Sequence, residues 1–109
     1  MRRLEVVYRP EAVADLQDIF RYVLRRSQSR VVAEQFVARV RERCRRIGLV
    51  PHGGTPRDDL APGLRTAAFE RRAVVAYRVE GDKVVITSIF FGGRDYEAIY
   101  RGREPEPDH

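Results

Sequence analysis

The side chains best suited to catalysis and metal binding are scarce in this sequence of 109 residues. Cys44 is the single cysteine, and His52 and His109 are the two histidines, so the chain offers no internal disulfide and no cysteine-based metal cluster. His52 lies in Pro-His-Gly-Gly-Thr-Pro, whose spacing places no carboxylate or nucleophile beside it and which lacks the lysine of a phosphate-binding loop. We therefore expect no catalytic residues, no metal site and no cofactor.

Arginine dominates the charged side chains, since 20 of the 21 basic residues are arginine and Lys83 is the sole lysine. Residues 1–48 hold twelve arginines and six acids, a charge of +6, whereas residues 49–109 hold nine bases and ten acids, a charge of −1. Guanidinium groups pair bidentately with carboxylates and phosphates, so this asymmetry points to acidic or polyanionic partners. A GC-rich coding sequence would explain the arginine content equally well.

The elements that must position these side chains follow from hydrophobic periodicity. Residues 4–8 alternate as a short strand does, and apolar residues at three- and four-residue spacing predict helices over 10–26 and 30–47. Residues 49–63 are dense in proline and glycine, which indicates one long irregular connection. Three strand-like runs follow, the last two joined by a Gly-Asp turn as an antiparallel hairpin: 64–69, 73–79 and 84–91.

This order of elements predicts an α+β fold. An N-terminal strand and an antiparallel helical hairpin pack on a small antiparallel sheet in the order β-α-α-β-β-β, with a short helical turn over 94–100. We expect one domain over residues 1–100 and a disordered charged tail over 101–109. No run of 18 apolar residues occurs and the N-terminus turns polar too soon for a signal peptide, so we expect a cytoplasmic protein without membrane contact.

Three segments, in unbroken order over about residues 4–100, carry a resemblance to a known family. They are YRPEAVADLQDIFRYV after the first strand, AEQFVARVRERCRRIGLVPHGGTPRDDLAPGLRTAAF, and VVAYRVEGDKVVITSIFFGGRDYEAI. Within them, Pro-Gly-Leu-Arg precedes a strand, Tyr-Arg-Val-x-Gly-Asp marks a hairpin, and Gly-Gly-Arg-Asp-Tyr follows the last strand. The chain resembles the ParE branch of the ParE/RelE toxin superfamily.

The resemblance implies the toxin component of a bacterial type II toxin–antitoxin pair. Its partner would be a small cognate antitoxin of the ribbon-helix-helix type, whose flexible C-terminal segment wraps around the toxin in a heterodimer or heterotetramer. ParE-type toxins are associated with inhibition of DNA gyrase by binding. RelE-type relatives are ribosome-dependent mRNA endoribonucleases.

The basic positions of the ribonuclease branch are incomplete in this chain. Alignment through Tyr77 places Arg65 at the first basic position, but Ala67 and Val74 stand at two others. Cleavage of RNA needs a base, an acid and positive charge against the phosphorane. If each missing contact is worth ~3 kcal/mol, the two losses slow the reaction by about 10⁴-fold.

Other positions of the ribonuclease branch match this chain only in part. Arg94 and Tyr100 match ribonuclease positions, whereas Phe90 and Phe91 stand where many relatives have a histidine. The sequence therefore favours a toxin that acts by binding over an enzyme. A ribonuclease of the RelE type, and a non-toxic interaction module or decayed toxin, stay as alternatives.

Four residues are candidate contacts with the target: Arg65, Arg78, Arg94 and Tyr100. Arg78 alternates with apolar neighbours, so a solvated or acid-paired position is its alternative. Arg65 and Arg94 could instead form ion pairs at the sheet edge with Asp58, Asp59 or Asp95.

The first helix has more apolar residues than one buried stripe needs. Residues 19–24 supply five, where a helix buried on one side needs about three in seven. The surplus suits a groove for an amphipathic antitoxin helix, so the candidate antitoxin contacts are Phe20, Val23 and Leu24, with Arg65 and Arg94. The arginine cluster of the second helix is either a solvated face or an electrostatic surface: Arg39, Arg41, Arg43, Arg45 and Arg46.

Overall fold

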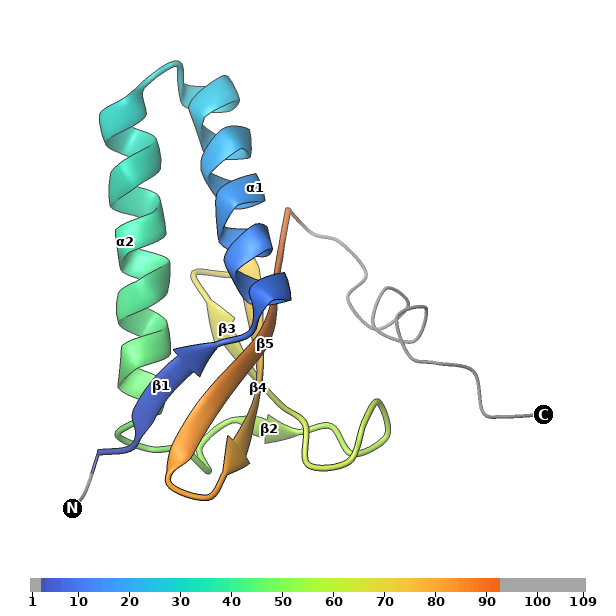
Figure 1. Cartoon of the computed structure of the whole chain (residues 1–109). Helices are drawn as coiled ribbons and strands as arrows, with labels where there is room; N and C mark the ends of the chain where they lie inside the picture. The colour runs from blue at the N-terminus through green and yellow to red at the C-terminus, as the bar shows by residue number, and fades with distance from the viewer. Residues whose placement is uncertain (1–2, 93–109) are drawn as a thin grey trace.

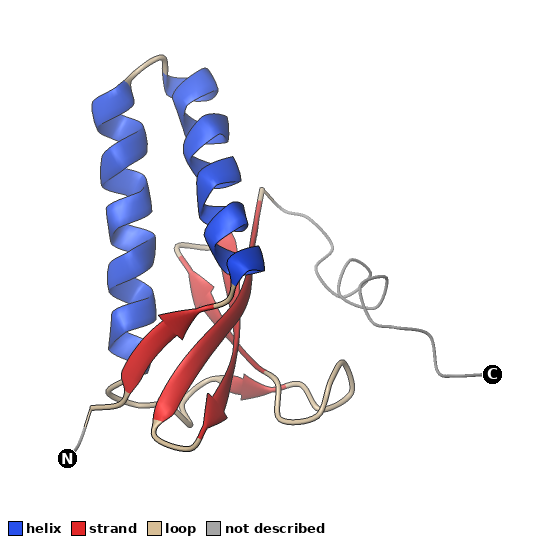
Figure 2. Cartoon of the chain, in the orientation of Figure 1, coloured by secondary structure: helices blue, strands red, loops and turns tan. Residues whose placement is uncertain are grey.

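The computed structural model describes residues 3–92, and the predicted α+β fold is confirmed over them. A hairpin of two helices packs on one face of a twisted sheet, and its tip extends beyond the sheet (Figures 1 and 2). The elements in chain order are β1 (Glu5–Tyr8), α1 (Pro10–Ser27), α2 (Arg30–Ile47), β2 (Thr55–Pro56), β3 (Arg65–Phe69), β4 (Ala73–Glu80) and β5 (Lys83–Phe91). The helical turn expected over 94–100 and the tail 101–109 lie outside the described residues.

Helix α1 begins and buries its side chains as its sequence predicts. Pro10 occupies the first helical position, where its missing N–H costs no hydrogen bond, and Glu11 lies in the first turn near the positive end of the helix dipole. Ala12, Leu16 and Ile19 are the buried residues of this helix. Their spacing of four and three residues aligns them along one stripe toward the sheet.

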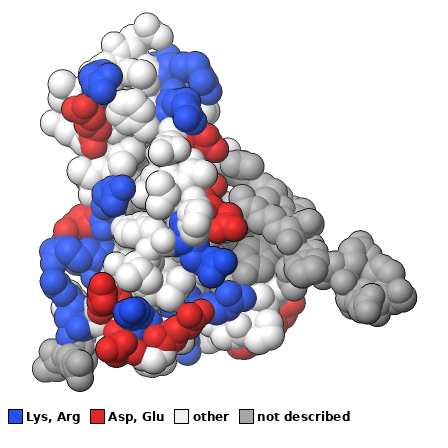
Figure 3. All heavy atoms as spheres, in the orientation of Figure 1, with Lys and Arg blue, Asp and Glu red and all other residues white. Residues whose placement is uncertain are grey.

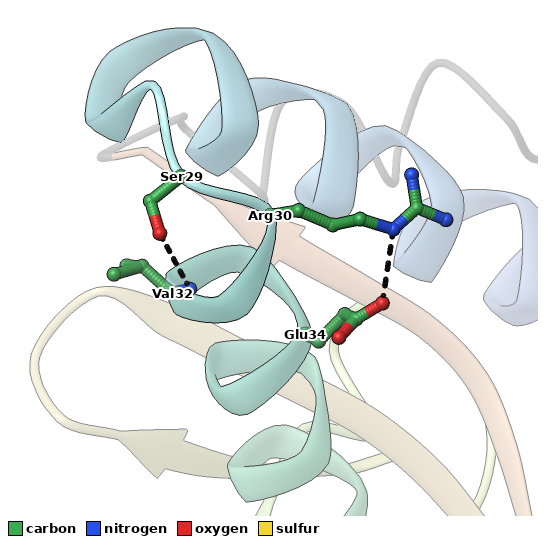
Figure 4. Close-up of polar contacts among 4 residues, drawn as sticks. All are labelled: Ser29, Arg30, Val32 and Glu34. Atoms are coloured by element: carbon green, nitrogen blue, oxygen red, sulfur yellow. Dashed lines mark hydrogen bonds and ion pairs between the residues drawn. The ribbon is translucent and has the colours of Figure 1, made fainter.

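The turn between the helices depends on Gln28 and Ser29. Gln28 adopts a left-handed conformation with φ 56°, and its N–H donates to the carbonyl oxygen of Leu24 at 2.8 Å. The Ser29 hydroxyl then caps α2 by accepting from the N–H of Val32 at 3.2 Å (Figure 4). The Ser-Gln-Ser sequence therefore ends one helix and starts the next, as predicted.

The sheet has the strand order β1-β5-β4-β3-β2. Antiparallel pairing of β3, β4 and β5 is as predicted, and the register Glu80↔Lys83 confirms the two-residue turn, in which Gly81 has φ 63°. Strand β1, in contrast, pairs with β5 in parallel, so the sheet is mixed and not wholly antiparallel. The two-residue strand β2 was not predicted, because Thr55 and Pro56 sit in a segment whose composition indicates a loop.

Both faces of the sheet are buried, by different parts of the chain. Helices α1 and α2 cover one face, where Phe36 and Val40 pack with Val75, Tyr77 and Ile86. Burying side chains of this size stabilises the fold by about 1.5–3 kcal/mol each. The opposite face is covered by the second half of the connection between α2 and β3, in a smaller cluster of Leu60, Ala61, Leu64, Ala76 and Phe90.

Gly48 is required where α2 meets β1, because the backbones of the two elements approach closely there. The helix ends at Ile47 as predicted, yet Gly48 keeps a right-handed φ of −62° and not a left-handed one. A Cβ at this position would lie 2.5 Å from the carbonyl oxygen of Leu4, whose N–H donates to Gly48 O at 2.9 Å. The glycine therefore permits a close backbone approach that fixes β1 against the end of α2.

Candidate functional site

Arg65, the first candidate target contact, lies beside Tyr77 at one end of the sheet, since the two residues face each other across β3 and β4. Its Nη1 donates to the carbonyl oxygens of His52 at 2.9 Å and Gly54 at 2.8 Å. Of the carboxylates proposed as its partners, Asp58 accepts from the N–H of Gly63 and Asp59 accepts from Arg57, while Asp95 lies outside the described residues. Arg65 therefore holds the loop after α2 in place.

Tyr77 acts on the same loop from the buried core. Its side chain is 0% exposed, and its hydroxyl donates to Pro51 O at 2.9 Å while accepting from the N–H of Gly54 at 2.9 Å. A Cβ at Gly54 would collide with this hydroxyl, so only glycine allows the contact. We call residues 49–54 the pinned loop.

Arg78 lies on the other face of the sheet and is neither freely solvated nor paired with an acid as its sequence suggested. Its Nε donates to the carbonyl oxygen of Pro62 at 3.1 Å and the residue is half-buried. Arg78 thus binds the segment that covers the second face. The remaining candidate contacts, Arg94 and Tyr100, lie outside the described residues.

A groove lies at the opposite end of the molecule, between α1, the start of α2, the β3–β4 turn and the end of β5. Its volume is about 630 Å³, and its apolar lining includes Tyr22, Val23, Val32 and Phe91. Tyr22 and Phe91 meet edge to face with ring centroids 5.2 Å apart. We call this hollow the hairpin groove.

Arginines surround the apolar lining of the hairpin groove. Arg26, Arg71 and Arg72 contribute to it, and Arg25 lines a smaller recess on the side of α1 that shares Tyr22 and Phe91. In residues 3–92, none of these four guanidinium groups lies within 4.0 Å of a carboxylate oxygen. The groove therefore combines aromatic and aliphatic surface with unneutralised positive charge.

The candidate antitoxin contacts on α1 are distributed unevenly around this groove. Val23 lines it, whereas Phe20 and Leu24 are half-buried and are not among its lining residues within the described part of the chain. The guanidinium of Arg30 lies over the Phe20 ring, 5.8 Å from its centroid. The apolar surplus of residues 19–24 is thus shared between the groove and contacts within the hairpin.

The sequence alone did not identify Tyr22, Phe91, Arg71 and Arg72 as parts of a site. Glu70, Arg71 and Arg72 form the tight turn between β3 and β4, where Glu70 has φ 50° and Arg71 has φ 58°. The N–H of Gly92 donates to Arg72 O at 3.1 Å. That hydrogen bond brings the turn next to the end of β5. Two adjacent arginines between strand-like runs were the available signal, but their meeting with α1 depends on tertiary packing.

Two pairs of side chains outside the groove, Arg39 with Glu70 and Cys44 with Tyr8, have shifted pKa values. The hydrogen bonds from Arg39 hold the pKa of Glu70 below its ordinary value. Burial raises the pKa of the Cys44 thiol to about 11 and also raises the pKa of Tyr8, with which the thiol is hydrogen-bonded. Cys44 is therefore a neutral, buried packing residue and not a nucleophile.

Metal-binding and membrane-spanning features were also sought in residues 3–92. No group of three or more His, Cys, Asp or Glu side chains in this part of the chain is placed to bind a metal ion. Neither α1 nor α2 has the length and apolar content that a membrane-spanning helix needs. His52 is exposed, with its carbonyl oxygen engaged by Arg65.

Comparison with known proteins first defines the kind of fold. The structure is similar to a solved chain described as the chromosomal ParDE toxin–antitoxin system from P. aeruginosa, with a TM-score of 0.70 and 24% sequence identity. The match covers 82% of this chain and 96% of that chain, so the two share a fold. A search of curated proteins found no match.

The family follows from the sequence itself. The model of the ParE toxin family, described as the ParE toxin of the type II toxin–antitoxin system parDE, matches residues 6–96. The chain belongs to this family, and the resemblance seen in its motifs is confirmed. It is a toxin of the type II toxin–antitoxin class.

Proposed function

We propose that this toxin acts in the cytoplasm by binding and inhibiting DNA gyrase, without chemistry of its own, and that a cognate antitoxin of the ribbon-helix-helix type neutralises it. The proposal rests on family membership for the target, because ParE-type toxins are associated with gyrase. The observation that carries the mode of action is the position of Arg65.

Arg65 aligns with a basic position of the ribonuclease branch, and its hydrogen bonds support a structural role. Its Nη1 donates to two backbone carbonyl oxygens, which fixes the guanidinium against the loop. The hydroxyl of Tyr77, the alignment point, is likewise satisfied by the same loop. Releasing Arg65 for phosphate would remove the donor from both carbonyl oxygens, and a hydrogen bond of this kind contributes about 0.5–1.5 kcal/mol.

The hairpin groove supports the second half of the proposal. Its apolar lining and its three arginines, Arg26, Arg71 and Arg72, suit an amphipathic segment that presents apolar residues on one side and carboxylates on the other. We assign it to the antitoxin, with Val23 and Tyr22 as apolar contacts. Neutralisation then depends on both apolar burial and charge pairing.

Gyrase supercoiling with purified toxin tests the proposed target. We expect the folded chain to block supercoiling or to trap cleaved DNA at a small molar excess, and added antitoxin to reverse the effect. Lack of inhibition at large excess, with folding confirmed by circular dichroism, rejects gyrase as the target. Ribosome-dependent mRNA cleavage that disappears in Arg65→Ala would instead support the ribonuclease alternative, and harmless expression of soluble toxin would support a non-toxic module.

A further inference from the structure

The pinned loop is held more firmly than its composition suggests. Residues 49–54 contain Pro51, Gly53 and Gly54, which is typical of a mobile connection. Four hydrogen bonds with the side chains of Tyr77 and Arg65 nevertheless fix its backbone, and the N–H of Gly53 donates to Val50 O at 2.9 Å within the loop. A loop held in one conformation loses little further entropy when a partner binds it.

The outward side of this pinned loop is apolar. Leu49 is 46% exposed and Val50 is 58% exposed, although each follows the buried end of α2 directly. Both line a recess of about 390 Å³ together with Arg43 and Arg46. Exposing these two neighbouring aliphatic side chains to water is unfavourable, and they add nothing to the core. Adjacent exposed apolar side chains of this kind are typical of a protein-contact surface.

Charge around the recess indicates the chemistry of the partner. Within the described part of the chain, no carboxylate oxygen lies within 4.0 Å of the guanidinium of Arg46, although, with the hydrogen bond from Arg45, its charge helps to lower the pKa of Glu42. The Nε of Arg43 donates to the carbonyl oxygen of Ala68 at 3.2 Å. Basic side chains gather along the flank of the molecule formed by the lower half of α2 (Figure 3). A complementary surface would carry an apolar residue ringed by carboxylates.

We infer that the pinned loop is the surface by which the toxin contacts its target protein, through Leu49 and Val50 inserted against an apolar, acidic patch of gyrase. This inference rests on the proposed function for the identity of the target. Arg65 and Tyr77 are positioning residues in this account, since they hold the loop without touching the partner.

The two surfaces lie at opposite ends of the toxin. In Figure 1 the loop after α2 lies at the lower end of the molecule, near the start of β1, whereas β5 ends high on the sheet beside α1. The lining residues of the recess and those of the hairpin groove do not overlap. Changes at the loop are therefore expected to leave binding at the groove intact.

The test compares gyrase inhibition by the wild-type toxin and by Leu49→Ser/Val50→Ser. We expect the double variant to need at least tenfold more protein for half-maximal inhibition, while its affinity for the antitoxin changes less than twofold. The matched control is Val13→Ser/Val31→Ser, which removes two aliphatic side chains that are 38% and 60% exposed outside both surfaces. This control should inhibit gyrase as the wild type does.

Two further variants test the roles of the Arg46 charge and of the Tyr77 hydroxyl separately from the apolar contact made by Leu49 and Val50. Arg46→Glu should weaken inhibition more at low salt than at high salt, whereas Arg30→Glu at the far end of α2 should not. Tyr77→Phe removes the hydroxyl that joins Pro51 and Gly54, so it should speed amide hydrogen exchange at Gly54 and weaken inhibition while antitoxin binding persists.

Three results would overturn the inference. The first is full gyrase inhibition by Leu49→Ser/Val50→Ser, and the second is a loss of inhibition in Val13→Ser/Val31→Ser equal to that in the loop double variant. The third is a loss of antitoxin affinity in the loop double variant that parallels its loss of inhibition, which would show general disruption of the fold. If the wild-type toxin does not inhibit gyrase, the proposed target is wrong, and growth arrest on expression becomes the readout for the same variants. Undiminished arrest by the loop double variant then rejects the loop, and loss of arrest with antitoxin binding retained supports it for another target.

Discussion

At the scale of single residues, Cys44 and Tyr8 join the second helix to the first strand. Cys44 is completely buried, and the guanidinium of Arg41 lies over the Tyr8 ring, 5.4 Å from its centroid. Burial is the main cause of the raised pKa of each of the two groups. The folded protein therefore keeps both protons at a pH where the unfolded chain begins to release them.

This proton retention predicts a loss of stability at high pH. The pKa of Cys44 rises from 9.0 to about 11 on folding, so its contribution is complete below pH 9 and is lost as the pH rises toward 11. We expect the free energy of unfolding to fall by at most about 3 kcal/mol from this group, since each of the two pKa units corresponds to about 1.4 kcal/mol. Urea unfolding of wild type and Cys44→Ala at pH values between 8 and 11 measures the difference.

The background of this measurement comes mainly from the five tyrosines, because Lys83 is the single lysine and arginine stays protonated throughout the range. Tyrosine ordinarily titrates near pH 10, so the comparison with Cys44→Ala, which keeps all five, isolates the contribution of the thiol. Cys44→Ala should be less stable at neutral pH because it leaves a cavity, but its stability should decline less between pH 9 and 11. Parallel curves for the two proteins would mean that the thiol is not held in its protonated form.

At the scale of elements, the helical hairpin depends on the start of α2. Ser29 is the N-cap, its hydroxyl satisfies the N–H of Val32, and Arg30 pairs with Glu34 at 3.1 Å one turn later (Figure 4). The exposed ion pair adds little. The cap contributes more, because the first turn of α2 has no acidic residue to stabilise the positive end of its dipole.

Ser29→Ala is therefore expected to lower the free energy of unfolding by about 1 kcal/mol. Ser29→Asp keeps an acceptor for Val32 and adds negative charge at the helix start, so it should match or exceed the stability of the wild type. Chemical denaturation monitored by circular dichroism distinguishes the three proteins. An equal loss in the alanine and aspartate variants would show that the hydroxyl contact does not stabilise the turn.

Local patterns predict the helices and the β4–β5 hairpin, because their determinants lie within a few residues of each other. The Ser-Gln-Ser turn and the Gly81-Asp82 pair are examples. The parallel pairing of β1 with β5 joins residues almost eighty positions apart, and its direction depends on where the hairpin returns the chain. Strand β2 is defined by its partner β3 and has no sequence pattern of its own.

The candidate site likewise has parts that local sequence predicts and parts that depend on tertiary packing. Val23 and Arg65 were identified from apolar surplus and from alignment with the superfamily. Arg65 nevertheless takes a role that only the folded loop reveals, since its acceptors are carbonyl oxygens of His52 and Gly54. Likewise, the hairpin groove assembles from four separate segments, so no window of sequence contains it.

At the scale of the whole molecule, a charge of +5 favours acidic partners at more than one place. The hairpin groove and the recess beside the pinned loop each combine apolar side chains with arginines, and they lie at opposite ends of the fold. If the antitoxin occupies the groove and the target contacts the loop, the two binding activities can be impaired separately. The loop variants above test one half of that expectation.

The other half requires charge reversal in the groove. Arg26→Glu/Arg71→Glu places two carboxylates beside Tyr22 and Phe91, where an acidic segment would be repelled, so the affinity for the antitoxin should fall at least tenfold. Gyrase inhibition should persist, and the antitoxin should reverse it poorly. Isothermal titration with the cognate antitoxin measures the affinity.

The control for this variant is Arg3→Glu/Arg9→Glu, which makes the same change in net charge near β1, where both side chains are exposed. It separates a local effect from the general weakening of attraction between a basic toxin and an acidic partner, because the general effect depends on net charge and is screened by salt. Similar losses of affinity in both double variants would place the antitoxin elsewhere on the toxin. A loss confined to Arg26→Glu/Arg71→Glu, still visible at high salt, would locate the antitoxin in the groove, since charges that become buried in an interface are screened much less.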